Sequence, residues 1–234
     1  MDQERVLTVD AWMPEAGLDE TVPTGRCTHA VKRMIDLSLS AGAVVALSPL
    51  FLVIAVLIKL DSPGPVAFRQ ERIGRQGKSF TMWKFRTMRL GADSEVHRQA
   101  VERAVNHPRS ALPDGEQVYK TMVDPRITRV GKFLRTWNLD ELPQLLNILR
   151  GDMSLVGPRP SLDYELPFYK DWYFRRFMLR PGLTGLWQVK RREAEDYDGM
   201  MRMDTEYVQS VSLWLDLRII AWTIPALIRD RGVF

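Results

Sequence analysis

Residues that build disulfides or zinc sites are scarce in this chain, which has 1 cysteine and 3 histidines among 234 residues. Because Cys27 has no second cysteine to pair with, an intrachain disulfide is impossible and a reducing compartment is expected. A zinc site is not expected either, because none of His29, His97 and His107 has a metal-binding partner at i+3 or i+4.

Several sequence signatures are also absent. The chain has no Walker A loop, no Gly-x-Gly-x-x-Gly after a strand and no nucleophile elbow. It has no helix-turn-helix, zinc-finger or aromatic RNA-binding signature, so nucleic acid is not an expected partner. The net charge of +4 then fits an anionic membrane surface or phosphate-bearing substrates. The first 25 residues contain no apolar run of the signal-peptide type, so a cleavable signal peptide is not expected.

One apolar segment, residues 37–58, carries no charge and is long enough to cross a bilayer, since about 20 residues suffice. Ser48 and Pro49 lie near its middle, where proline removes a backbone donor and bends or breaks a helix. Both flanks are rich in Lys and Arg, which stay on the cytoplasmic side. These features favour a re-entrant helix-break-helix, with Ser48 donating to a carbonyl that Pro49 leaves without its partner. A kinked transmembrane helix and a buried soluble helix are the alternatives.

The remaining segments predict short strands and helices. Residues 1–30 are predicted to be a cytoplasmic tail with a short helix near residues 6–13. The Asp-Ser-Pro-Gly-Pro sequence at 61–65 ends the apolar segment, and residues 66–77 and 78–88 are predicted to pair as a hairpin. Helices are predicted at residues 92–105, 127–135, 142–149 (ended by Gly151), 162–178 and 194–210, with a loop at 107–116.

The C-terminal segment, residues 212–229, is apolar but contains Asp216 and Arg218, with Trp214 and Trp222 flanking its centre. This pattern is typical of a helix lying in the membrane interface, and a packed core helix explains it equally well. We therefore predict an α/β, mostly helical catalytic domain over residues 63–234, with interfacial amphipathic helices. The re-entrant membrane segment would occupy residues 31–62.

Asp140 and Glu141 place two adjacent carboxylates at the predicted start of a helix. One interpretation is capping, with Asn138 as the N-cap and Glu141 as the N3 residue. The other is catalytic: neighbours on a helix point about 100° apart, so one carboxylate would attack phosphorus while the other holds Mg²⁺. A helix N-terminus would favour the incoming phosphate, and Mg²⁺ or cationic side chains would reduce the repulsion between the two anions.

Arginines near this pair suit a diphosphate, because arginine binds phosphate in a bidentate way. Arg135 precedes Asp140 by five residues, and Arg159 lies between two prolines that restrict its loop. Residues 180–188 form a turn-rich loop that begins at Arg180 and contains two glycines and the Thr184 hydroxyl; Gln188 ends it. Such a loop lets backbone amides approach a nucleotide or sugar. A solvated surface role for each arginine and a structural turn for the loop are the alternatives.

Eight motifs occur in order along residues 31–220, at 32–36, 48–49, 64–74, 84–88, 124–131, 140–147, 151–160 and 180–185. By these motifs the chain resembles the bacterial sugar transferases, the monotopic polyprenyl-phosphate phosphoglycosyl transferases in their small form. The resemblance implies that a sugar 1-phosphate passes from a UDP-sugar to undecaprenyl phosphate with release of UMP, which initiates glycoconjugate or exopolysaccharide assembly.

The resemblance also assigns roles to residues. Asp140 would attack the β-phosphorus and carry the phosphosugar, and Glu141 would bind Mg²⁺. Ser48 and Pro49 would break the membrane helix. The enzyme would face the cytoplasm from the bacterial inner membrane and contact anionic lipids, with a homo-oligomer left open. The residues expected to bind substrate are Lys84, Arg86, Arg135, Arg159, Arg180, Thr184 and Gln188.

Three departures from the family pattern bear on these expectations. The N-terminal tail is longer than in the minimal members, and residues 91–117 are long for the loop they occupy. After Gln188 the chain reads Val-Lys-Arg-Arg, where many members have Asn-Gly or Ser-Gly, and this leaves the sugar unassigned. Two rival hypotheses are an inactive membrane scaffold or regulator of the same fold and a transferase that releases UDP.

Overall fold

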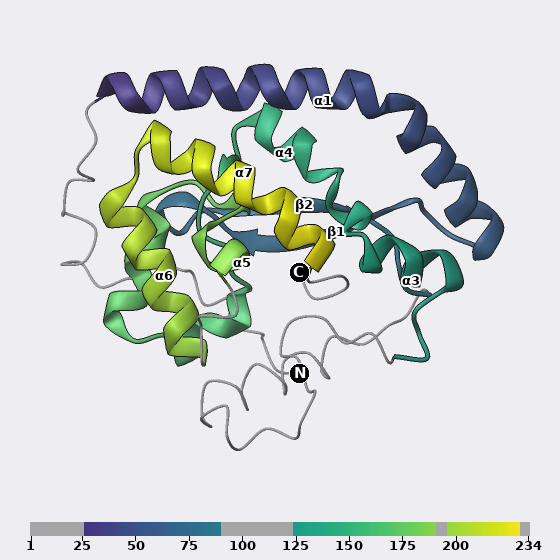
Figure 1. The fold of residues 1–234 in the computed structure, drawn as a ribbon. Helices are drawn as coiled ribbons and strands as arrows, with labels where there is room; N and C mark the ends of the chain where they lie inside the picture. The colour runs from purple at the N-terminus through teal and green to yellow at the C-terminus, as the bar shows by residue number, and fades with distance from the viewer. Residues whose placement is uncertain (1–25, 90–123, 191–195, 230–234) are drawn as a thin grey trace.

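The computed structural model describes residues 26–89, 124–190 and 196–229 (Figure 1). The predicted helix near residues 6–13, the predicted helix at 92–105 and the predicted loop at 107–116 lie outside the described residues. The rest is mostly helical, with two small two-stranded sheets.

The apolar segment forms a single helix, α1 (Arg26–Asp61), which runs through Ser48 and Pro49 without interruption. It bends in its C-terminal half rather than separating into two arms (Figure 1). Ser48 Oγ donates to the Val45 carbonyl at 2.8 Å, which is the carbonyl that an N–H at position 49 would have bonded. This confirms the predicted hydrogen bond of Ser48 and explains how the helix continues past the proline, whereas the predicted break at Ser48 and Pro49 does not appear.

Within the described residues, α1 is the one helix long and apolar enough to cross a membrane, and only 11% of its most apolar window is buried. Its inner face packs on the hairpin and on later helices through apolar side chains. Ala43, Val44 and Leu47 contact one core cluster, and Ile54 and Ile58 are buried in another. The outer face leaves large apolar side chains exposed, so α1 is apolar both where it packs on the protein and on its outer face.

The predicted hairpin is confirmed. Strand β1 (Ala67–Ile73) pairs antiparallel with β2 (Ser79–Phe85), with Ile73 opposite Ser79 and Ala67 opposite Phe85. The connecting turn, η2 (Arg75–Gly77), holds Gln76 and Gly77 at positive φ. Buried Met82 and Phe85 fix the inner face of the hairpin against the helices.

Two short helices flank the turn that carries the paired carboxylates. Helix α3 (Arg129–Thr136) begins where the Thr128 side chain accepts from Gly131 N at 2.9 Å. The turn η4 (Leu139–Glu141) leads into α4 (Gln144–Arg150), which ends at Gly151 with φ +100°. The helices predicted at 127–135 and 142–149, and the terminating glycine, are thereby confirmed.

The second sheet was not predicted. Strand β3 (Ser154–Val156) pairs in parallel with β4 (Gly182–Thr184). The two backbones approach so closely that a Cβ on Gly182 would lie 2.1 Å from Gly157 N. Glycine is therefore required where these segments meet.

The single helix predicted at 162–178 is wrong. The segment forms two 3₁₀ stretches, η5 (Asp163–Phe168) and η6 (Asp171–Met178), and Pro167 lies inside the first. Proline cannot donate to a continuing helical ladder, so the segment shortens into tighter turns. Helices α5 (Leu186–Lys190), α6 (Tyr197–Ser210) and α7 (Leu213–Arg229) follow, and α6 confirms the described part of the helix predicted at 194–210.

Helix α7 combines both interpretations of the C-terminal segment. Asp216, Ile219 and Ala226 are buried against the domain. The opposite side exposes an apolar stripe at helical spacing, which consists of Trp214, Leu217, Ile224 and Ile228. The helix therefore packs on the core and also presents an apolar face outward.

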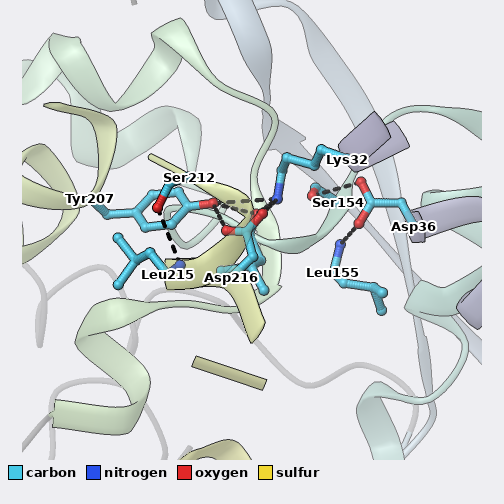
Figure 2. A network of polar contacts seen from close by, with 9 residues as sticks. Lys32, Asp36, Ser154, Leu155, Tyr207, Ser212, Leu215 and Asp216 are labelled. Atoms are coloured by element: carbon cyan, nitrogen blue, oxygen red, sulfur yellow. Dashed lines mark hydrogen bonds and ion pairs between the residues drawn. The ribbon is translucent and has the colours of Figure 1, made fainter. Parts of the chain in front are cut away.

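The N-terminal end of α1 is tied to the domain by a polar network (Figure 2). Lys32 Nζ lies 2.6 Å from Asp216 Oδ2 and 3.0 Å from the Val156 carbonyl. Asp36, one turn further along α1, accepts from Ser154 Oγ at 2.8 Å and from a backbone N–H of β3 at 3.0 Å. Helix α1 is thus joined to β3 and α7 by buried charge-assisted hydrogen bonds.

The C-terminal end of α1 is tied to the same domain. Asp61 Oδ2 accepts from Val130 N at 2.9 Å, at the start of α3. Arg86, just past β2, donates to the Ser62 carbonyl at 2.6 Å. Both ends of this apolar helix therefore contact one folded unit.

Candidate active site

A small, open cavity of about 30 Å³ lies beside the carboxylate-bearing turn. The hairpin, η4 and α4, the loop after β3, and the β4–α5 region all contribute to its lining. Its polar lining residues are Arg72, Lys84, Glu141, Gln144, Arg159 and Gln188.

The charges that line this cavity do not balance. Three cations, Arg72, Lys84 and Arg159, face one carboxylate, Glu141. Lys84 Nζ pairs with Glu141 Oε1 at 2.7 Å. Burial, together with the nearby charge of Arg159, lowers the pKa of Arg72 to about 10. Arg72 stays charged at neutral pH, so the cavity has an excess of positive charge that suits an anion such as phosphate.

The paired carboxylates lie on the η4 turn rather than in the first turn of an α-helix. The capping interpretation is wrong, because Asn138 adopts a left-handed conformation (φ 55°) and its side chain makes no capping hydrogen bond. Helix α4 begins only at Gln144, so the argument from a helix dipole no longer applies to Asp140.

The two carboxylates have different surroundings. Glu141 lines the cavity and keeps 20% of its side chain exposed. Asp140 is 4% exposed and is not among the cavity-lining residues. Burial lowers the pKa of Arg135, and the neighbouring Asp140 charge acts in the opposite direction. Arg135 and Asp140 are therefore close enough for their charges to interact.

Lys84, Arg159 and Gln188, which were predicted to bind substrate, meet Glu141 at the cavity, but Arg135 and three other predicted substrate-binding residues are not among its lining residues. Arg180 Nε donates to the Gly151 carbonyl at 2.8 Å, at the end of α4. Thr184 Oγ1 lies 2.8 Å from the hydroxyl oxygen of Thr223, on α7. Arg86 holds the chain that leaves α1. In the described structure these three side chains connect elements instead of facing the cavity.

Sequence reasoning missed Arg72 and Gln144. Arg72 belongs to a hairpin strand in which Arg69 is also basic, and Arg75 follows in the turn. Only its burial, with 5% exposed, distinguishes it from these neighbours. Because burial depends on the packing of β1 against the loop after β3, no local pattern identifies this residue.

Replacing Arg86 with methionine should destabilise the fold rather than weaken substrate binding. The change would leave the Ser62 and Pro63 carbonyls without their buried donor, and we expect a loss of about 3 kcal/mol in unfolding free energy. Thermal unfolding in detergent measures this, with the exposed Arg89→Met as the matched control. An unchanged unfolding temperature together with a raised KM would instead support the original assignment of Arg86 to substrate binding.

The side chains that line the cavity offer a magnesium ion few ligands. Among the described residues, no group of three or more His, Cys, Asp or Glu side chains could enclose a metal. Magnesium commonly takes one or two carboxylates and completes its shell with phosphate oxygens and water. Glu141 is the carboxylate at the cavity that fits this pattern. A metal there would have to compete with Lys84 for the carboxylate.

Comparison with known proteins places nearly the whole chain in one family. A family model described as "Bacterial sugar transferase" matches residues 27–230. The chain is 43% identical over 206 residues to the "Exopolysaccharide production protein ExoY" of Sinorhizobium fredii, covering 87% of this chain and 88% of that protein.

Two further relatives have names that state a reaction. The "UDP-glucose:undecaprenyl-phosphate glucose-1-phosphate transferase" of Caulobacter vibrioides is 42% identical over 211 residues, covering 87% of this chain and 72% of that protein. The "Undecaprenyl-phosphate galactose phosphotransferase" of Salmonella typhimurium is 39% identical over 209 residues, covering 89% of this chain and 43% of that protein.

Proposed function

Because this chain belongs to the bacterial sugar transferase family, and is thus a transferase, we propose that it moves a sugar 1-phosphate from a UDP-sugar to undecaprenyl phosphate and releases UMP. The observation that carries the proposal is the cation-rich cavity beside the Asp140–Glu141 turn. The ExoY relative, which matches over most of its length, supports a place in exopolysaccharide assembly.

The cavity cations would bind the diphosphate of the donor. Arg72 and Arg159 both line the cavity. The Arg159 guanidinium is able to bind phosphate oxygens in pairs, whereas Arg72, whose Nη1 and Nη2 donate to the Pro160 carbonyl and to Gln70, would contribute its positive charge. Lys84 would add a point charge next to Glu141. Together these groups offset the charge of the diphosphate and orient its β-phosphorus toward the η4 turn.

Asp140 would be the nucleophile. Its carboxylate oxygen forms a bond to the β-phosphorus while the bond from that phosphorus to the oxygen of UMP breaks, so UMP leaves with the electron pair. The product is an acyl phosphate that carries the sugar. The low exposure of Asp140 would protect this intermediate from water, and donor binding would have to bring the carboxylate to the cavity.

The second half-reaction regenerates the enzyme. A phosphate oxygen of undecaprenyl phosphate attacks the same phosphorus, and the acyl oxygen–phosphorus bond breaks to restore the Asp140 carboxylate. Glu141 would hold Mg²⁺, which would supply positive charge to the transferring phosphoryl group. Arg135, beside Asp140, would favour its ionised form between turnovers.

We also propose that the enzyme is monotopic and faces the cytoplasm. Lys32 and Asp61, near the two ends of α1, both bond to the same folded unit, so a single crossing would have to pull one of these contacts away from it. The bend, the exposed outer face of α1 and the apolar stripe of α7 all fit a segment that enters and leaves one leaflet.

Single cysteines introduced at Arg26 or at Lys59 of a Cys27→Ser chain should both react with a maleimide only from the cytoplasmic side of the membrane. The reason is that both ends of α1 would share one face of the membrane. A membrane-impermeant maleimide applied outside spheroplasts and then after lysis measures this. Labelling of one site from outside before lysis would contradict the monotopic proposal.

The reaction is tested by purified protein with undecaprenyl phosphate, Mg²⁺ and a panel of UDP-sugars. We expect UMP as the nucleotide product with at least one sugar. Release of UDP would favour a glycosyl transfer without the phosphate, and the absence of any nucleotide product across the panel would favour the inactive scaffold.

A further inference from the structure

The loop that carries Arg159 is held by an unusual series of hydrogen bonds. The four successive carbonyls of residues 158–161 each accept from a different donor outside the loop. In order, the donors are Gly182 N, Arg176 Nη2, Arg72 Nη1 and Ile73 N, at 2.8, 2.7, 3.1 and 2.9 Å. Because prolines at 158 and 160 also fix φ, this loop has little freedom left.

One of these donors belongs to a fully buried ion pair. Arg176 Nη2 lies 2.6 Å from Asp204 Oδ2, and the two side chains are 2% and 1% exposed. The same Nη2 atom donates to the Arg159 carbonyl. Burial raises the pKa of the Asp204 carboxyl to about 6. The pair therefore contacts the Arg159 carbonyl through Arg176 Nη2, and Asp204 holds that nitrogen in place.

This pair lies outside the cavity, because neither residue lines it. It joins η6 to α6, and Arg176 Nη1 also bonds to the hydroxyl of the half-buried Tyr169 at 2.9 Å. A buried ion pair is weak evidence for stability, since well-packed apolar residues of similar size often stabilise a fold equally well. Stability alone therefore does not explain why charges occupy these two positions.

We propose that Arg176 and Asp204 are positioning residues for Arg159. By holding its peptide group, they fix the direction in which the Arg159 guanidinium enters the cavity, where it would meet the diphosphate of the donor. This inference rests on the proposed function, and it assigns a role to a charged pair in the core that never touches the substrate.

The test is the double variant Arg176→Met/Asp204→Leu, which removes both charges together and leaves neither unpaired. We expect it to fold and to lose roughly 10²-fold in kcat/KM for UMP release, the scale of a small misplacement of a catalytic group. Arg159→Ala should lose a similar factor. The triple variant should lose no more than Arg159→Ala alone, because the pair acts through Arg159.

A matched control is available on the same two structural segments. Lys170, which precedes η6, pairs with Asp198 of α6 at 2.5 Å but is exposed and contacts no loop carbonyl. Lys170→Met should therefore keep kcat/KM near that of the unaltered chain. If the double variant unfolds, Arg176→Lys replaces it. Lysine keeps a charge beside Asp204 but loses the planar guanidinium, whose Nη1 bonds to Tyr169 and so orients Nη2 toward the Arg159 carbonyl, and a loss in the same direction is expected.

Two results would overturn the proposal: a folded double variant with full kcat/KM, or a loss that adds in full to that of Arg159→Ala. Two readouts work without turnover. Hydrogen exchange of the peptide covering residues 157–163 should accelerate in the double variant and not in Lys170→Met. Affinity for inorganic pyrophosphate should fall equally in the double variant and in Arg159→Ala. If the unaltered chain released no UMP, the proposed reaction would fail, while these two readouts would still decide whether the pair positions Arg159.

Discussion

Asp140→Asn should reduce UMP release by roughly 10⁴-fold, the scale seen when a nucleophile that works with other groups is removed. Asparagine keeps the size of the side chain, but its neutral amide does not form an acyl phosphate. Asp140 is buried beside Arg135, so the variant must also be shown to fold. UMP release is measured at saturating donor, with thermal unfolding of the same preparation.

Asp171→Asn is the matched control, because Asp171 is exposed at the start of η6 and lies outside the cavity lining. It should keep normal turnover. A folded Asp140→Asn protein that retained more than a tenth of the activity would show that another group attacks phosphorus. The nucleophile assignment would then be wrong even if the reaction itself were right.

Glu141→Gln should lower kcat by roughly 10²- to 10³-fold at fixed Mg²⁺, as expected when a group that stabilises charge in the transition state is lost. Part of the activity should return at higher Mg²⁺, because the amide oxygen is a weaker ligand than the carboxylate. The measurement is the Mg²⁺ concentration that gives half-maximal UMP release, which should rise.

The Glu141 change also breaks the ion pair with Lys84, so Lys84→Gln separates the two effects. That variant removes the competing cation and leaves the carboxylate, and the half-maximal Mg²⁺ concentration should fall. If the two substitutions shifted this concentration in the same direction, or if Glu141→Gln left it unchanged, Glu141 would not be the metal ligand.

The elements that could be predicted from the sequence are those with strong local signals. The uncharged segment formed α1, the glycine-rich turn formed the hairpin, and Gly151 ended α4 at positive φ. The rescue of the Val45 carbonyl by Ser48 also follows from local geometry alone. In each case the deciding interaction lies within a few residues along the chain.

Local signals do not determine contacts that depend on distant packing. The substrate-binding roles predicted for Arg86 and Thr184 stay predictions; in the structure their side chains bond to the chain after α1 and to α7, which are distant in sequence. Arg72 and Asp204 were not identified, because only the folded chain brings them to the loop at residues 158–161. The 3₁₀ form of η5 and η6 was also missed, although Pro167 was visible as a signal.

The central claim is that Asp140 carries the sugar phosphate during turnover. Protein mixed with its UDP-sugar and Mg²⁺, without acceptor, is quenched in acid and its peptides are weighed by mass spectrometry. The account predicts a mass gain of one sugar phosphate on the peptide that contains Asp140, its loss on addition of undecaprenyl phosphate, and its absence from Asp140→Asn. Rapid UMP release with no such adduct at any time point would contradict the account.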